Sequence, residues 1–321
     1  MKRIVVLVLL LQTAFAGSAS AQDRYPARPV QMIVPFAAGT ATDFLARTLA
    51  EKLSQKLGQP FVVQNRTGAS GIVATELVAK ALPDGYTILV VNSLHSINPP
   101  LHANLPYDTL RDFAGIAKFA EAPSVFVVHP GLGVRTVKEF IAFAKRQPGK
   151  IHYGTSGVGT NTHLGGAYFA ARAGIELVAV PYKGQEIMAD IIAGRIEALF
   201  APAPALLQLI KDGKLIGLAV TSREPLRTPI ELATVESAGE MAGFEYGTYY
   251  GLVAPAKVPR LVLEQLSRVA IQSVQEKDIR DKMEAQVIFP RDIGPVEFDA
   301  FIRSDLERVS ALLKSLGAQT N

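Results

Sequence analysis

Short apolar runs and amphipathic segments alternate along most of the chain. The runs VQMIVPF at 30–36 and YTILVV at 86–91 are mostly apolar, which predicts strands buried on both faces. Between them, leucine recurs every four residues from 45 to 57, which predicts a helix with one buried side over about 42–57. Strands joined by helices in this order predict an α/β fold with mostly parallel sheets flanked by helices.

The same pattern begins again near the middle of the chain. A strand at 125–128 is followed by a helix that starts at a capping box formed by Thr136 and Glu139. Strands and helices then alternate up to a last strand at 249–254 and the closing helices. We therefore predict two α/β lobes, the second inserted into the first. Lobe 1 comprises residues 22–124 and 250–321, and lobe 2 comprises residues 125–249.

The N-terminus has the three parts of an export signal. Met1-Lys2-Arg3 is basic, residues 4–11 (IVVLVLLL) are apolar, and Ala19-Ser20-Ala21 resembles a cleavage site. The alternative is a membrane anchor, but a spanning helix needs about 20 apolar residues and this run is much shorter. We expect a signal peptide over residues 1–21, cleavage after Ala21 and a location in the periplasm.

Composition narrows the function classes. Hydrophobic residues make up 49% of the chain and charged residues 19%, which excludes an intrinsically disordered protein. The absence of cysteine excludes disulfides, thiol nucleophiles and a lipid-modified N-terminus. Cleavage would remove Lys2 and Arg3 and take the net charge from +4 to +2, without any block of like charge. We therefore expect no nucleic-acid partner.

Sequence motifs of common exported enzymes are missing. The chain has no G-x-S-x-G, no S-x-x-K, no phosphate-binding G-x-x-x-x-G-K-[ST] and no H-E-x-x-H. We expect no cofactor, no metal and no catalytic residue. An exported enzyme that uses His95 or His163 is kept as an alternative.

Two loops combine glycine with small hydroxyl residues where a predicted strand leads into a helix. They are AAGTATD at 37–43 and TSGVGTNTH at 155–163, one in each predicted lobe. Glycine lets a ligand approach the backbone, and the start of a helix offers unpaired N–H groups with about half a positive charge. This chemistry suits a carboxylate. The alternative is an ordinary helix cap with a tight turn.

Several stretches together resemble one family. In chain order they are YPARPVQMIVPF (25–36), VVQNRTGASG (62–71), LPDGYTILV (82–90), INPPLHANLPYDTLRDF (97–113), IHYGTSGVGTNTHLGG (151–166), VPYKG (180–184) and GTYYGLVAP (247–255). With the export signal and the length, they resemble the exported substrate-binding receptors of tripartite tricarboxylate transporters, the Bug or TctC family.

The resemblance implies a two-lobed periplasmic binding protein of the type 2 Venus-flytrap topology. It implies a small organic carboxylate bound in the cleft between the lobes, and delivery of that ligand to membrane transporter subunits. We expect a monomer. A ligand sensor for a membrane signalling partner is the alternative that the same fold allows.

The resemblance and the two loops together define the expected ligand contacts. These are Phe36, Ala38, Gly39, Thr40, Asp43, Ser93, Thr155, Ser156, Gly159, Thr160, Asn161 and Tyr182. The family's first loop is usually richer in proline and glycine. The chain also lacks the acidic residue that often follows the strand ending in FAPAP at 200–204. This departure favours a simple carboxylate over an acidic amino acid.

Overall fold

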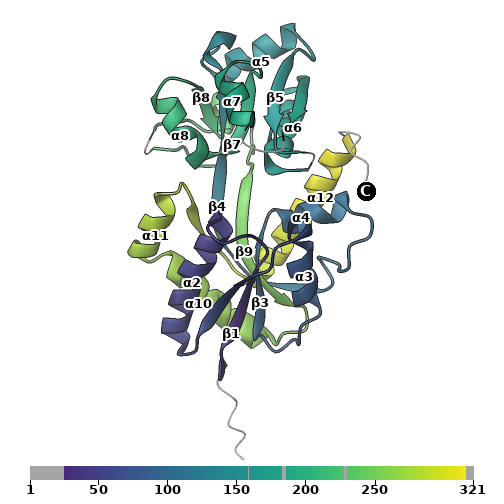
Figure 1. Ribbon diagram of the computed structural model, residues 1–321, viewed down its shortest axis with the longest axis vertical. Coiled ribbons are helices and arrows are strands. Elements are labelled where there is room, and N and C mark those ends of the chain that lie inside the picture. Colours follow the sequence, from purple (N-terminus) through teal and green to yellow (C-terminus); the bar gives the residue numbers. More distant parts are fainter. Residues whose placement is uncertain (1–24, 158, 183–185, 228–229, 316–321) are drawn as a thin grey trace, which may run out of the picture.

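The computed structural model describes residues 25–157, 159–182, 186–227 and 230–315. The predicted signal peptide lies outside these ranges. Figure 1 shows two groups of strands and helices, one above the other, joined by the long strands β4 (Phe113–Val128) and β9 (Gly247–Pro255). Among the described residues, no helix is both long enough and apolar enough to cross a membrane.

The lower group contains the first strands of the chain and most of its last helices. Its elements are β1 (Val30–Val34), α2 (Ala41–Leu57), β2 (Phe61–Asn65), α3 (Ile72–Ala79), β3 (Thr87–Asn92), α10 (Arg260–Val274), α11 (Lys277–Glu284) and β10 (Phe289–Ile293). Its core packs the leucines of α2 against β1, β3 and α10. The predicted helix over 42–57 is therefore confirmed to within one residue at its start.

The upper group contains the middle of the chain. Its elements are α5 (Val137–Arg146), β5 (Ile151–Thr155), α6 (Asn161–Ala173), β6 (Leu177–Pro181), α7 (Glu186–Ile192), β7 (Ala198–Pro202), α8 (Ala203–Lys211), β8 (Ile216–Val220) and α9 (Val235–Gly239). A cluster of phenylalanine rings fills its core, with Phe126 stacked on Phe200 at 4.3 Å between ring centroids.

The sheet is mixed. Strands β2, β1 and β3 are parallel at one end, and β7, β5 and β6 are parallel at the other. The two joining strands are antiparallel to each other and to their remaining neighbours. This follows because β4 carries the chain into the upper group and β9 carries it back. The α/β fold is confirmed, and the parallel pairing holds outside the two joining strands.

The predicted lobe boundaries, at 124/125 and 249/250, lie inside β4 and β9. Two helices also bridge the groups. They are α4 (Leu94–Leu101) and α12 (Pro295–Ser315), which pack against each other, and α12 runs upward toward α6 in Figure 1. Ile97 of α4 and Leu312 of α12 join the core of the upper group. The two groups therefore share apolar contacts beyond the joining strands.

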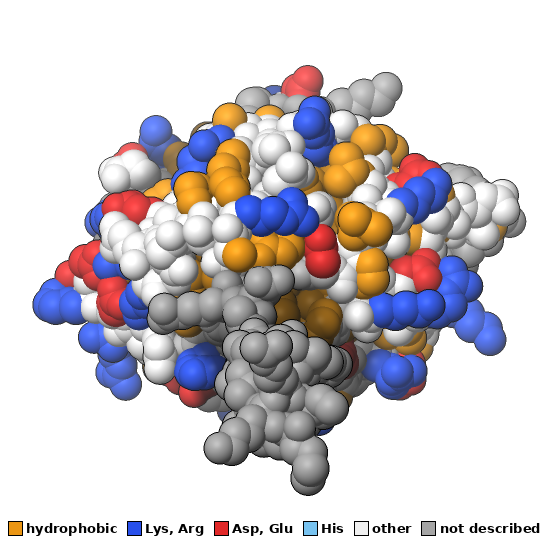
Figure 2. Space-filling model, turned by 90° about the horizontal axis from the view of Figure 1, so that it is seen from below, with side chains coloured by type: hydrophobic (Ala, Val, Ile, Leu, Met, Phe, Trp, Pro, Cys, Tyr) orange, Lys and Arg blue, Asp and Glu red, His pale blue; other side chains and the backbone are white. Residues whose placement is uncertain are grey.

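The base of the lower group has a mixed surface. Figure 2 shows this face from below, with basic, acidic and hydrophobic side chains interspersed. Large apolar side chains exposed in the lower group include Leu82 and Leu261, at 73% and 71%. Single exposed apolar side chains of this kind are normal in folded proteins.

Candidate ligand-binding site

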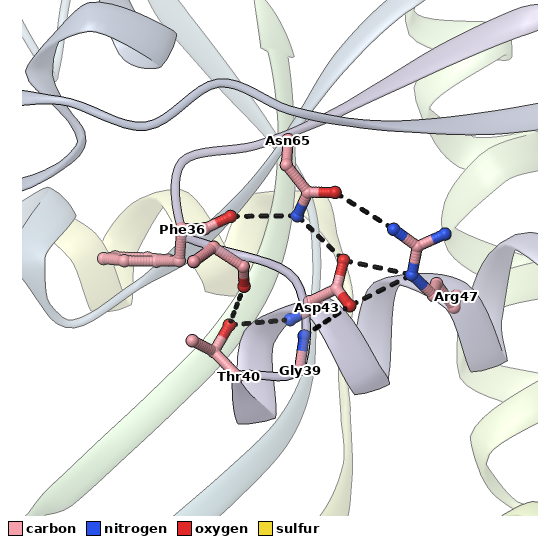
Figure 3. Close-up of polar contacts among 7 residues, drawn as sticks. Phe36, Gly39, Thr40, Asp43, Arg47 and Asn65 are labelled. Carbon is pink, nitrogen blue, oxygen red and sulfur yellow. Dashed lines mark hydrogen bonds and ion pairs between the residues drawn. The ribbon is translucent and has the colours of Figure 1, made fainter.

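The loop between β1 and α2, here called loop one (residues 36–43), turns at Gly39 and caps the helix with Thr40 (Figure 3). Gly39 has a φ of +85°, which favours glycine. The Thr40 hydroxyl accepts a hydrogen bond from the Asp43 N–H at 3.3 Å and donates one to the Ala37 carbonyl at 2.9 Å. Its proton is therefore used within the loop.

Asp43 anchors loop one from inside. Its carboxylate is 3% exposed and accepts hydrogen bonds from the Gly39 N–H at 3.0 Å, Arg47 Nε at 3.0 Å and Asn65 Nδ2 at 2.8 Å (Figure 3). Burial favours the neutral acid, but the hydrogen bonds from Arg47, Asn65 and Gly39 outweigh it and hold the pKa of Asp43 below its usual range. Loop one is therefore organised by an ionised carboxylate whose charge is balanced by Arg47.

Asn65 ties loop one to the neighbouring strand. Its amide also donates to the Phe36 carbonyl at 2.9 Å, and its oxygen accepts from Arg47. Phe36 itself is half-buried and lines a hollow of about 10 Å³ with Asn92, His95 and Asn98. Burial lowers the pKa of His95 to about 4, so this ring is neutral near pH 7.

The loop between β5 and α6, here called loop two (residues 155–163), repeats this construction. The Thr160 hydroxyl accepts from the His163 N–H at 3.4 Å and donates to the Gly157 carbonyl at 2.7 Å. The Gly159 N–H donates to His163 Nδ1 at 3.2 Å, and Gly159 has a φ of +78°. Each loop therefore has a glycine at positive φ, a threonine cap and a side-chain acceptor four residues after the glycine.

Hydroxyl groups organise the rest of loop two. Thr162 accepts a hydrogen bond from the Ser156 N–H at 2.8 Å, and Thr155 accepts one from the Gly157 N–H at 3.2 Å. Ser156 is exposed, whereas Thr155 is buried. Gly159 is buried too, because its Cα faces Leu101 of α4, so closely that an added Cβ would lie 2.2 Å from Leu101 Cδ1.

Two other predicted residues meet at the start of β9. The Asn161 amide donates to Thr248 Oγ1, and its oxygen accepts from the Tyr246 hydroxyl at 3.2 Å. The Ser93 hydroxyl, at the end of β3, accepts from the Tyr249 N–H at 3.2 Å. Residues that follow a lower strand and an upper strand therefore both contact the segment that joins the two groups.

Tyr182 lies after β6 and is bound to β5 and α7. Its N–H donates to the Thr155 carbonyl at 2.8 Å, but its hydroxyl donates to Asp190 of α7 at 2.7 Å. Burial and this hydrogen bond raise the pKa of Tyr182 to about 12. Its hydroxyl is therefore engaged with α7.

Ten of the twelve predicted residues fall into two clusters, and Ser93 and Tyr182 lie outside both. Loop one brings together Phe36, Ala38, Gly39, Thr40 and Asp43, and loop two brings together Thr155, Ser156, Gly159, Thr160 and Asn161. Within the described parts of the chain, no hydrogen bond joins one loop directly to the other. Ala37, Ala38 and Gly39 are exposed in loop one.

Sequence reasoning missed the anchoring role of His163 and the part of Arg47 and Asn65 in holding Asp43. The signal was present in the chain, because GTATD at 39–43 and GTNTH at 159–163 align residue by residue. That alignment places Asp43 opposite His163, and both side chains can accept a hydrogen bond.

Comparison with known proteins identifies the family. The model of the tripartite tricarboxylate transporter family receptor, TctC, matches residues 45–318. The chain belongs to this family. Protein BugT of Bordetella pertussis is 31% identical over 319 residues, which cover 98% of this chain and 98% of BugT.

Two solved structures share the fold. A TctC solute-binding protein from Polaromonas has a TM-score of 0.81 at 27% identity, covering 91% of this chain and 99% of that one. Rpa4515 of R. palustris, solved with adipate, has a TM-score of 0.74 at 30% identity, covering 91% and 98%. The predicted periplasmic-binding-protein fold is thus confirmed, and the chain is a TctC-type solute receptor rather than a member of an enzyme family.

Proposed function

We propose that this TctC-family receptor binds a small organic carboxylate between loop one and loop two. The observation that carries the proposal is the matched pair of glycine–threonine loops, one at the start of α2 and one at the start of α6. The adipate bound by Rpa4515 supports the ligand class. Ser93 and Asn161 lie beside the segment that joins the lobes, and we include them in the site with Tyr182 at its margin.

Backbone groups supply the attraction for the carboxylate. The N–H groups of Ala41 and Thr42 form no hydrogen bond with any residue that the structure describes. These are first-turn groups of a 17-residue helix, where unpaired N–H groups favour an anion. Arg47 neutralises Asp43 close by, so the buried carboxylate does not dominate the local charge.

Membership of the family supports a proposal for the cellular role. We propose that the chain is exported, that cleavage after Ala21 releases it into the periplasm, and that residues 22–124 with 250–321 and residues 125–249 act as two lobes that close on the ligand. The closed form then delivers the carboxylate to the membrane subunits of a tripartite transporter, and the receptor acts as a monomer.

Calorimetric titration of the chain from residue 22 with adipate, malate and benzoate tests the proposal. We expect one ligand per chain and a higher melting temperature when the ligand is present. The free energy of unfolding should rise by RT ln(1 + [L]/Kd), about 2.7 kcal/mol at a ligand concentration of 100 Kd. Sugars and metal ions serve as negative controls. Stabilisation by one of these controls and by none of the carboxylates would contradict the proposal.

Gly39→Ala provides the matched variant. Gly39 and Gly58 both have positive φ, +85° and +74°, and an added Cβ meets nothing within 4 Å at either position. The two alanine variants should therefore lose similar stability, about 1 kcal/mol. Only Gly39→Ala should weaken carboxylate binding, by about tenfold or more, because only that methyl group lies in a binding loop.

A further inference from the structure

We propose that His163 is a positioning residue for ligand binding, which holds loop two in its binding shape as a hydrogen-bond acceptor and works only while its imidazole is neutral. The inference rests on the proposed function, since it concerns how one of the two binding loops keeps its geometry. It assigns a role to a buried histidine that the resemblance left without one.

The surroundings fix the ring of His163. The residue is 8% exposed, and its ring stacks on that of Tyr153 with 6.5 Å between centroids and 13° between planes. The Tyr153 hydroxyl donates to the His163 carbonyl at 3.1 Å. With the ring held in this way, Nδ1 lies 3.2 Å from the Gly159 nitrogen.

Gly159 has little freedom to find another acceptor. Its positive φ and the close approach of Leu101 fix the backbone on one side, and the Thr160 cap fixes it on the other. The buried Gly159 N–H therefore depends on His163 Nδ1. A buried N–H without an acceptor is destabilising, so loss of this acceptor should shift loop two away from its binding shape.

The acceptor role sets the protonation state. If Nδ1 accepts, the neutral ring carries its proton on Nε2, and the imidazolium form would turn a donor toward the Gly159 N–H. Burial lowers the pKa of His163 below its usual value, so the neutral form prevails at pH 7. The loop should therefore lose its anchor only at acidic pH.

Other charged groups lie near α6 and must be considered. The titratable or charged groups on elements packed against it are Tyr153 of β5, Tyr246 before β9, and the Asp305–Arg308 pair of α12. The pKa values of both tyrosines are raised by burial, so neither ionises between pH 5 and 8. His152 of β5 is half-exposed and paired with Glu197, and it is the neighbouring histidine that an experiment must separate from His163.

Binding measurements at several pH values test the role. Kd for adipate is measured from pH 8 to pH 5 for the wild type, His163→Asn and His152→Asn. Asparagine offers an acceptor oxygen that does not titrate, so His163→Asn should bind within a few-fold of the wild type at pH 7.5. As the pH falls toward 5 and the ring becomes protonated, the wild type should lose affinity relative to His163→Asn, by up to about tenfold, the scale expected for one unsatisfied buried donor.

Adipate itself titrates over this pH range, but it does so equally with each protein, so the ratio of two Kd values at one pH is free of this effect. His152→Asn should keep the pH dependence of the wild type. His163→Ala should bind weakly at every pH and should not recover at pH 8. A constant ratio of Kd between the wild type and His163→Asn from pH 8 to pH 5 would overturn the proposal.

A second readout needs no ligand. In ¹⁵N–¹H spectra of the free protein, the Gly159 resonance should move with a midpoint below pH 6.5 in the wild type and in His152→Asn, and should stay fixed in His163→Asn. A Gly159 resonance that does not titrate in the wild type would overturn the role of His163. Absence of carboxylate binding at pH 7.5 in the wild type would instead contradict the proposed function, so the two failures are distinguishable.

Discussion

Loop one and loop two form the same backbone turn with different acceptors. In loop one the acceptor is an ionised carboxylate that three donors hold, whereas in loop two it is a neutral imidazole nitrogen that accepts one N–H. The common element is the glycine–threonine pair that precedes each helix. The same turn therefore forms with either a charged or a neutral acceptor at its fifth position.

The loops also differ in what supports them. Loop one is tied to β2 by Asn65 and to its own helix by Arg47. Loop two has mainly local hydrogen bonds and packs on Leu101 of α4, a helix of the bridge between the two groups.

Removal of the loop one acceptor should give the largest effect. Asp43→Ala removes the acceptor of three donors, the Gly39 N–H, Arg47 Nε and Asn65 Nδ2. It should lower the free energy of unfolding by about 2–4 kcal/mol. Urea denaturation measures this change. Asp281→Ala, which removes an exposed pair with Lys277, is the control and should cost less than about 0.5 kcal/mol. Equal losses in the two variants would mean that the buried network contributes nothing.

An added methyl group should distinguish the two glycines. Gly159→Ala places a Cβ against Leu101 and should destabilise the protein by about 2–3 kcal/mol, against about 1 kcal/mol for Gly39→Ala, whose Cβ meets open space. Thermal unfolding of both variants measures the difference. When Leu101 is already alanine, the further change Gly159→Ala should cost less stability than it does in the wild type. An equal cost in both backgrounds would contradict the assigned contact.

Removal of the caps should affect the two loops equally. Thr40→Ala and Thr160→Ala each remove a hydroxyl that caps a helix, so each should cost about 1 kcal/mol. Urea denaturation of the pair checks the equality, with Thr40→Ser and Thr160→Ser as variants that keep the hydroxyl. A loss of stability in only one of the two alanine variants would contradict an equal role for the two caps.

The smallest effect should be the pH dependence of loop one. The folded pKa of Asp43 lies below its unfolded value, so its contribution to stability is present above the unfolded pKa and is lost as pH falls through the folded pKa. The stability difference between the wild type and Asp43→Asn should therefore shrink from pH 5 toward pH 3. A difference that grows over this range would reverse the assigned sign.

Local signals in the sequence predict most of the elements that form the site. Apolar runs located β1 and β3, and the leucine repeat located α2 to within one residue at its start. The stretch at 155–163 was predicted to lead from a strand into a helix, and α6 begins within it at Asn161. Both binding loops therefore lie where the sequence placed them.

The elements that hydropathy missed each have a physical reason. Helix α4 contains Pro99 and Pro100, which argue against a helix, but the Thr109 hydroxyl satisfies the His95 carbonyl that Pro99 leaves without a donor. The first half of β4 carries Lys118 and Glu121, which form a buried ion pair at 2.7 Å and interrupt the apolar pattern.

The anchors were missed for a different reason. The sequence predicts Asp43 as a ligand contact, and the structure adds that its carboxylate accepts hydrogen bonds from its own loop, its own helix and β2. Asn65 lies 22 residues away in the sequence, and only the pairing of β1 with β2 brings it to the loop. Contacts of this kind depend on the tertiary fold, which local patterns do not specify.

Titration of the ¹⁵N-labelled chain from residue 22 with small carboxylates, adipate first, tests the central claim most directly. The signals to follow are the amides of Ala41 and Thr42 at the start of α2 and of Asn161 and Thr162 at the start of α6. We predict that both pairs shift and saturate together, with one Kd and one ligand per chain. Shifts at one loop while the other stays fixed at saturation, or no saturable shift at either loop with any of the carboxylates, would contradict a ligand held by both.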